Sequence, residues 1–200
     1  LRVEVSDRVR QHLDTYLATP HHINQINLDA TQLGLLNLQD FQKTGQYFWK
    51  QIQVFDVGYI SFGNTKGEFI GVERLDNGSL LINEVSEKNQ LGKLYVYETD
   101  IQGNRTKVTA VKNWEPREEA WYTDAVKAGK PLWSQIYQWE DKPDVISISS
   151  SYPLYNQRNQ IVGVLSIDLI LSQISDFLRH LKLSPSGKIF IVERDGLLVS

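Results

Sequence analysis

Apolar positions recur with a helical period over the first quarter of the chain. Between residues 5 and 17, apolar side chains return every three or four residues, which predicts a helix over residues 1–18 with one apolar face. We expect Thr19-Pro20 to end this helix, because the residue before a proline disfavours helical backbone angles. The same period predicts a second helix over residues 24–33 and a third over residues 38–55.

The pattern changes to short strands after residue 56. Turn residues such as Asp76-Asn77-Gly78 separate seven short runs that predict an antiparallel sheet. The predicted strands cover residues 57–62, 67–73, 79–85, 94–98, 106–111, 145–152 and 161–167. A short helix over residues 121–128 should end at Gly129, and a last helix should cover residues 169–181. This order predicts an α+β fold in which a long N-terminal helix accompanies the sheet.

Composition excludes several classes of function. The 200 residues carry a net charge of −3, so the chain lacks the basic surface that nucleic acids and anionic membranes need. Cysteine is absent, which removes disulfides and thiolate metal sites. No apolar run approaches the ~18 residues of a membrane span. The chain starts at Leu1 and contains no methionine, so we interpret it as part of a longer protein from which any anchor has been cut.

No motif in the sequence predicts catalysis, a cofactor or a metal. The histidine pair His21-His22 has no acid at the spacing of a metal site, and adjacent side chains point in different directions. Phosphate-binding loops, nucleophile elbows and zinc-protease motifs do not occur. The acids Glu115, Glu118 and Glu119 could still contain a general acid–base pair. We expect no enzymatic activity, cofactor or metal in this chain, whereas the rest of the protein could be enzymatic.

Aromatic and acidic residues concentrate between positions 114 and 168. The stretch contains Trp114, Glu119, Trp121-Tyr122 and Tyr137, and it ends on Asp168 after an apolar strand. Rings with a few charged groups suit a pocket for a small molecule. The order of these residues resembles the ligand-binding core of the double-Cache sensor domains, which are PAS-like and lie outside the membrane in bacterial receptors.

The resemblance implies a role for most of these residues. Trp114, Trp121-Tyr122 and Tyr137 stand where the family has the aromatic residues that close the pocket. Asp168 stands where the family has the aspartate that holds the ligand ammonium group. The resemblance therefore implies a ligand of the amino-acid or amine class.

Glu119 departs from the family pattern. The family has an arginine at this position, which holds the ligand carboxylate through a bidentate pair of hydrogen bonds, and Arg117 lies two positions too early. A glutamate would repel a carboxylate. Together with Asp168 and the rings it would instead suit a cation, because ring faces attract cations by ~0.5–2 kcal/mol. We expect an amine or another cationic ligand.

Each of these residues also has a structural interpretation. Glu119 could lie in solvent at the start of a helix, where an acid favours the positive end of the helix dipole. Asp168 could cap the helix that we expect to begin at Leu169. The aromatic side chains could belong to the hydrophobic core, as rings on a half-buried sheet usually do.

The resemblance also implies where the chain belongs. It places the protein in the cell membrane with this domain periplasmic or extracellular. It divides the chain into helical residues 1–56, a membrane-distal sensor module over residues 57–183, and the start of a membrane-proximal module over residues 184–200. That last part contains a hairpin signal at Asp195-Gly196. A loose likeness of the tail to cyanobacterial kinases and cyclases suggests a histidine kinase or an adenylate or guanylate cyclase as the output domain.

Other classes of protein fit the same sequence. The chain could be a soluble solute-binding or carbohydrate-binding domain, or a double-Cache spacer that dimerises without a ligand. In a sensor or a spacer, the apolar face of the first helix could pack against its twin in a homodimer. A sensor would shift between two arrangements of this helix when its ligand binds.

Overall fold

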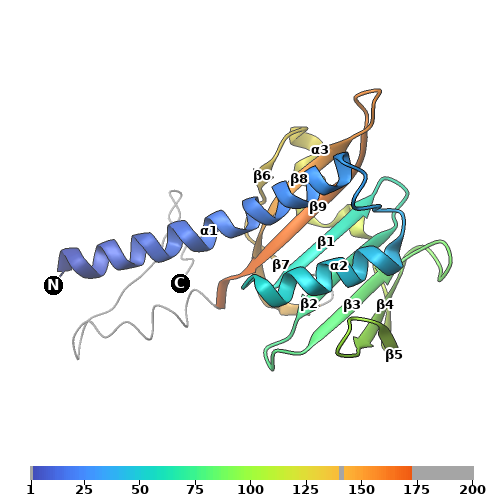
Figure 1. The fold of residues 1–200 in the computed structure, drawn as a ribbon, viewed down its shortest axis with the longest axis horizontal. Coiled ribbons are helices and arrows are strands. Elements are labelled where there is room, and N and C mark those ends of the chain that lie inside the picture. Colours follow the sequence, from blue (N-terminus) through green and yellow to red (C-terminus); the bar gives the residue numbers. More distant parts are fainter. Residues whose placement is uncertain (1, 140–141, 173–200) are drawn as a thin grey trace.

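One antiparallel sheet forms the centre of the molecule (Figure 1). The computed structural model describes residues 2–139 and 142–172, and within them the sheet has nine strands. Eight follow the order β5-β4-β3-β2-β1-β9-β8-β6, and β7 pairs with β8. The strands are β1 (Tyr59–Asn64), β2 (Phe69–Arg74), β3 (Leu80–Val85), β4 (Lys93–Thr99), β5 (Arg105–Asn113), β6 (Leu132–Trp133), β7 (Tyr137–Trp139), β8 (Lys142–Tyr155) and β9 (Ile161–Ile170). The helices are α1 (Arg2–Gln32), α2 (Phe41–Val54) and α3 (Ala120–Ala128), and the 3-10 turn η1 (Pro116–Glu118) precedes α3.

The predicted α+β class and the seven predicted strands are confirmed. The ends of the strands differ from the prediction by at most three residues. The additional strands β6 and β7 have two and three residues, which is too short for a period to show in the sequence. Gly129 ends α3 as predicted, with a left-handed φ of 62° that glycine adopts without strain.

Alternate residues of the central strands face two different hydrophobic clusters. Ile60 of β1 packs in a cluster with Ile23 of α1 and Phe48 of α2, and all three side chains are fully buried. Its neighbour Tyr59 belongs to the second cluster, which contains Trp121 of α3. Since successive side chains of a strand point to opposite faces, α1 and α2 cover one face of the sheet and α3 the other.

The first helix is longer than predicted. α1 continues through Pro20, so the predicted break at Thr19-Pro20 and the two separate helices are wrong. Pro20 is buried, and Ile23 and Asn24 just after it are fully buried against the sheet. Asn24 Nδ2 also donates a hydrogen bond to the carbonyl of Ser150 at 2.7 Å. These contacts together offset the ~3 kcal/mol that a proline costs inside a helix.

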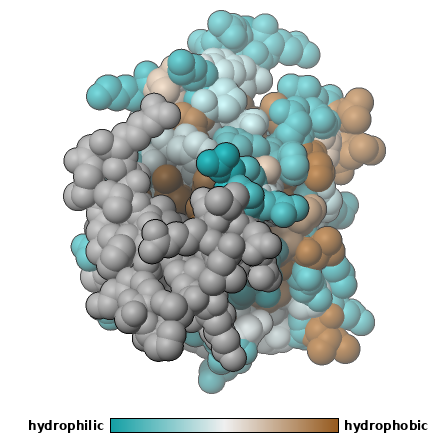
Figure 2. All heavy atoms as spheres, turned by 90° about the vertical axis from the view of Figure 1, so that its left-hand side faces the viewer, coloured by the Kyte–Doolittle hydropathy of each residue, from teal (hydrophilic) through white to brown (hydrophobic). Residues whose placement is uncertain are grey.

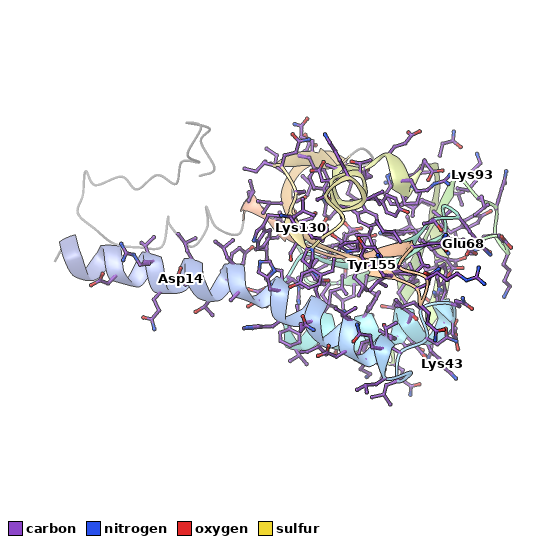
Figure 3. The ribbon with its side chains drawn as sticks, turned by 90° about the horizontal axis from the view of Figure 1, so that it is seen from above. Asp14, Lys43, Glu68, Lys93, Lys130 and Tyr155 are labelled. Atoms are coloured by element: carbon purple, nitrogen blue, oxygen red, sulfur yellow. The ribbon has the colours of Figure 1, made fainter. Side chains whose placement is uncertain are left out.

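The N-terminal part of α1 extends beyond the sheet, whereas Tyr16, one turn before Pro20, still packs against the core and donates a 3.4 Å hydrogen bond to the carbonyl of Ile170. Figure 1 shows this arm projecting from the sheet, and Figure 3 shows the labelled Asp14 on it. Seen from this end, hydrophilic side chains cover much of the described surface, and hydrophobic ones form separate small patches (Figure 2). Within the described residues, no helix combines the length and apolar character that a membrane span requires.

The strand β9 is also longer than predicted. It continues to Ile170, because β8 pairs with it as far as the partners Ser147 and Ile170. Leu169 is therefore a fully buried strand residue and not the first residue of a helix. Asp168 lies within β9, so its predicted role as a helix cap is wrong. The remainder of the predicted helix 169–181 after residue 172 and the hairpin at Asp195-Gly196 lie outside the described residues.

Candidate functional site

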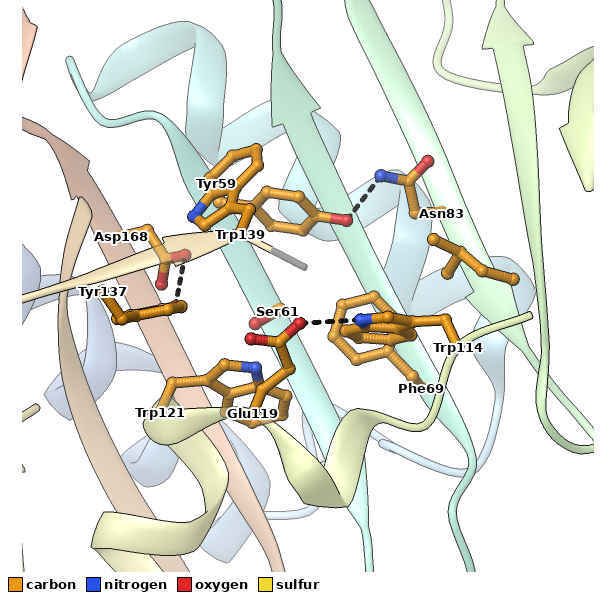
Figure 4. A pocket seen from close by; sticks show the side chains of 11 residues that line it. Tyr59, Ser61, Phe69, Asn83, Trp114, Glu119, Trp121, Tyr137, Trp139 and Asp168 are labelled. Carbon is orange, nitrogen blue, oxygen red and sulfur yellow. Dashed lines mark hydrogen bonds between the residues drawn. The ribbon is translucent and has the colours of Figure 1, made fainter. Parts of the chain in front are cut away.

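A cavity lies on the face of the sheet that α3 covers (Figure 4). The free space inside it is about 30 Å³, enough for a few water molecules at most, so a larger ligand requires the lining side chains to move. Strands β1, β2, β3, β4, β7 and β9 supply the floor and sides, and the segment from Trp114 to Trp121 closes it. The lining residues are Tyr59, Ser61, Phe69, Asn83, Leu94, Trp114, Glu119, Trp121, Tyr137, Trp139 and Asp168.

Asp168 is a buried carboxylate held by three hydroxyl groups. Its side chain belongs to β9, between β1 and β8, and the residue is 6% exposed. Ser149 Oγ donates to Asp168 Oδ1 at 2.7 Å, and Tyr137 OH donates to Oδ2 at 3.1 Å. Ser166 Oγ adds a longer hydrogen bond to Oδ1 at 3.4 Å. These bonds fix the carboxylate at one end of the cavity.

Burial makes the charge of Asp168 costly. Because burial shields this carboxyl group from water, its pKa is raised from 3.8 to about 6, and the nearby negative charge of Glu119 adds to the rise. The hydrogen bonds from Ser149 and Tyr137 act in the opposite direction. Burial and the charge of Asp168 also raise the pKa of Tyr137 well above 10, so its phenol remains a hydrogen-bond donor. A cation bound beside Asp168 would favour the charged carboxylate again.

Glu119 is the second carboxylate of the cavity. It is the N-cap residue of α3, but its side chain makes no capping hydrogen bond. Instead, Trp114 Nε1 donates to Glu119 Oε1 at 2.8 Å, and the residue is 8% exposed. Figure 4 shows the Glu119 carboxylate pointing into the space between the rings. The interpretation of Glu119 as a solvated acid at a helix start is therefore wrong.

Six aromatic side chains form most of the wall: Tyr59, Phe69, Trp114, Trp121, Tyr137 and Trp139. Phe69 meets Trp114 edge to face at 4.8 Å between ring centroids and lies 5.9 Å from Trp121. Tyr59 meets Trp139 edge to face at 5.3 Å. Trp139 is oriented further by a 2.8 Å hydrogen bond from its Nε1 to Ser147 Oγ. The rings support one another and leave aromatic surface toward the cavity.

A polar cluster adjoins one side of the cavity. Asn83 Nδ2 donates to Tyr59 OH at 2.5 Å and to Glu73 Oε2 at 3.1 Å. Glu73 is 3% exposed, and its other oxygen pairs with Lys142. Lys142 Nζ also lies 5.9 Å from the centre of the Trp139 ring. The positive charge of this lysine is therefore already compensated by Glu73.

Five of the six predicted site residues line the cavity, namely Trp114, Glu119, Trp121, Tyr137 and Asp168. Tyr122 does not; it packs behind Trp121, edge to face at 5.5 Å. Successive residues of a helix point about 100° apart, so Trp121 and Tyr122 cannot both face one cavity. A role of the five residues in binding a ligand stays a prediction.

Arg117 does not replace the missing arginine of the family pattern. Its guanidinium pairs with Glu115 at 2.7 Å and donates to the carbonyl of Thr65 at 3.1 Å. Arg117 is exposed and is not among the lining residues. The charged groups that line the described cavity are therefore two carboxylates, with no lysine, arginine or histidine among them.

Sequence reasoning missed six of the lining residues: Tyr59, Ser61, Phe69, Asn83, Leu94 and Trp139. Strand alternation places Tyr59 and Ser61 on one face of β1. The sequence does not say that this face lies beneath α3, because both faces of β1 are buried. Trp139 belongs to a strand of three residues, which left no pattern to detect.

Comparisons with known proteins place this fold in a family. A family model described as methyl-accepting chemotaxis protein-like, first PDC sensor domain, matches residues 68–176. No curated protein sequence matches the chain. The fold is similar to the ligand-binding domain of the Pseudomonas aeruginosa PAO1 amino acid chemoreceptor PctC in complex with GABA, with 18% identity and a TM-score of 0.60. That alignment covers 98% of this chain and 71% of the PctC domain.

The ligand-binding domain of the Campylobacter jejuni chemoreceptor Tlp3, in complex with 4-methylisoleucine, is similar at 13% identity and a TM-score of 0.58. The alignment covers 98% of this chain and 65% of the Tlp3 domain. At such identities the likeness shows a shared fold. Together with the family model, it confirms the identification as a Cache-type, PAS-like sensor domain of signal-transduction receptors. With more than half of its residues matched by the family model, the chain belongs to the family of methyl-accepting chemotaxis protein-like first PDC sensor domains.

Proposed function

We propose that this chain is the extracytoplasmic sensor of a membrane-anchored chemoreceptor and that its cavity binds a small organic cation. The observation that carries the proposal is the pair Asp168 and Glu119. Both carboxylates are buried at one cavity, and no positively charged side chain lines its described walls. A cation would supply the missing charge and would meet ring faces on several sides.

Two relatives support an amine-containing ligand. The PctC structure holds GABA and the Tlp3 structure holds 4-methylisoleucine, and both of these molecules carry an ammonium group. Both also carry a carboxylate, for which the present cavity offers no positive partner. We therefore favour an amine over an amino acid, as expected from the glutamate at position 119.

The matching family favours a chemotaxis signalling domain as the output, in place of the histidine kinase or cyclase expected from the tail. Membrane anchoring and a homodimer through α1 are parts of the same proposal. The arm of α1 beyond the sheet supports the membrane anchor and the homodimer, because this part of the helix is available to continue toward a membrane or to pack against a second copy (Figure 1). In this proposal the cavity binds its ligand and does not catalyse a reaction on it.

Isothermal titration calorimetry of the purified domain tests the proposal. A panel of small amines and a panel of α-amino acids are titrated into the wild type, Asp168→Asn and Asp76→Asn. Asp76 is exposed in the turn between β2 and β3 and serves as the matched control. We expect amines to bind the wild type and the control, and the affinity of Asp168→Asn to fall at least ~10-fold, as for loss of a charged partner. Binding of amino acids alone, unaffected by Asp168→Asn, would contradict the proposal. Binding of neither panel would favour the ligand-free spacer.

A further inference from the structure

A second hollow, an open groove, lies at the C-terminal end of α1, away from its projecting arm. The last turns of α1, the loop to α2, the turn between β1 and β2, the residues after α3 and the ends of β8 and β9 surround it. The free space there is about 950 Å³, against about 30 Å³ in the cavity that Asp168 lines. Ligand pockets measure roughly 300–1,000 Å³. The groove therefore has room for an organic ligand without movement of its walls.

The floor of the groove is apolar. Leu36 and Leu38 from the loop after α1, Phe62 from β1 and Leu154 from β8 line it. These four side chains are at most 7% exposed and belong to the hydrophobic cluster that α1 and α2 cover. Val162 of β9 adds an apolar wall that is 38% exposed. An apolar group that packs on this floor loses its contact with water, which favours binding.

The charges of the groove are positive. Lys66 and Lys130 are its charged residues, and its described lining contains no aspartate, glutamate or histidine. Both lysines are exposed, and none of the ion pairs found among the described residues involves them. A chain with a net charge of −3 thus has a groove of the opposite sign. A carboxylate is complementary to it, whereas an amine is repelled.

The two lysines lie on opposite sides of the groove. The turn that contains Lys66 is hydrogen-bonded at 3.2 Å to the carbonyl of Val162 in β9. Lys130 precedes β6, and the hydroxyl of Tyr155 in β8 donates to the carbonyl of the adjacent Gly129 at 2.7 Å (Figure 3). The strands β9 and β8 lie between β1 and β6 in the sheet, so the apolar floor separates the two positive charges. A ligand on this floor meets an ammonium group at either side.

We infer that this groove is a second ligand site, which binds an organic acid with an apolar body and one carboxylate. The apolar body packs on the floor, and the carboxylate pairs with Lys66 or Lys130 at the rim. The site does not depend on the proposed amine site, because its floor belongs to the other face of the sheet and its charge has the opposite sign.

Calorimetry with a short series of aromatic acids tests the chemistry of the groove. Phenylacetate, 3-phenylpropionate and 4-phenylbutyrate differ only in the number of methylene groups, and 4-phenylbutanamide is the uncharged control. We expect affinity to rise about 4-fold with each methylene group, and the longest acid to bind at least ~5-fold more tightly than the amide. An affinity that does not rise with length, or an amide that binds as tightly as its acid, would overturn the inference. Absence of binding by all three acids would also overturn it and leave the groove to a macromolecular partner.

Substitutions of exposed lysines test where the acid binds. The double variant Lys66→Gln, Lys130→Gln removes both charges of the groove, and Lys107→Gln on β5, at the far edge of the sheet, is the matched control. We expect the double variant to bind 4-phenylbutyrate at least ~5-fold more weakly and the amide unchanged, whereas the control binds both like the wild type. Asp168→Asn should leave the affinity for the acid unchanged. An unchanged affinity in the double lysine variant, or a loss in Asp168→Asn alone, would refute the second site. Because the two sites take different ligands, either result would leave the amine proposal intact.

Discussion

Replacing Asp168 by asparagine should stabilise the ligand-free protein at neutral pH, although it removes a proposed ligand contact. Burial raises the pKa of this carboxyl from 3.8 to about 6. The folded protein therefore binds the proton more tightly than the unfolded chain, and ionisation of Asp168 lowers the free energy of unfolding as the pH rises from about 4 to about 6. A pKa difference of about two units corresponds to about 3 kcal/mol, which is lost in full above about pH 6.

Asparagine keeps the shape of the side chain and avoids this loss at every pH. Its amide makes poorer hydrogen bonds with Ser149 and Tyr137, which costs about 1 kcal/mol. We expect Asp168→Asn to unfold with a free energy about 2 kcal/mol higher than the wild type near pH 7.5. Near pH 4 both side chains are neutral, so the variant should become less stable than the wild type by about 1 kcal/mol.

Urea unfolding followed by tryptophan fluorescence measures both differences. The exposed control Asp76→Asn should stay within about 0.5 kcal/mol of the wild type at both pH values. A melting experiment should show the same order, with about 2–4 °C for each kcal/mol in a domain of this size. The reasoning is refuted if Asp168→Asn is less stable than the wild type near pH 7.5, or if its difference from the wild type does not change with pH.

Three further predictions concern other parts of the structure. Arg105→Ala leaves Glu84 buried without its 2.8 Å partner and should lower the free energy of unfolding in urea by about 3–5 kcal/mol. Gly63→Ala places a Cβ 2.8 Å from Trp121 Cη2, so this ring should move and ligand affinity measured by calorimetry should fall about tenfold. Asn24→Ala removes a buried hydrogen bond between α1 and β8 and should lower the free energy of unfolding by about 1–2 kcal/mol. In hydrogen exchange, the protection of α1 that a ligand induces should decrease, while the affinity for the ligand stays unchanged.

The sequence predicts the sheet well because its information is local. Turn residues such as Asp76-Asn77-Gly78 and the apolar runs between them fix where strands begin and end. The errors arise where distant contacts decide. Pro20 stays inside a helix because the sheet buries its neighbours, and β9 extends to Ile170 because β8 continues beside it. Neither contact can be predicted from the residues next to it in the sequence.

The candidate site was predictable in part for the same reason. Trp121 and Asp168 stand in a recognisable order, but the direction of Glu119 depends on the indole of Trp114, five residues earlier. A spacing of five residues across an irregular segment predicts no contact. Tyr59 and Trp139 come from strands that meet in space through pairing, so their place in the wall required the structure.

Because α1 continues through Pro20, the sheet holds this helix on both sides of the proline. Asn24 behind Pro20 donates a hydrogen bond to β8, and Tyr16 one turn ahead of it donates one to the carbonyl of Ile170 in β9. Ahead of Tyr16, the 14 residues from Arg2 to Thr15 extend the helix by about 21 Å. A rotation of about 5° at the base of this extension would move its far tip by about 2 Å, so a small rearrangement of β8 or β9 would be carried to the end of the helix.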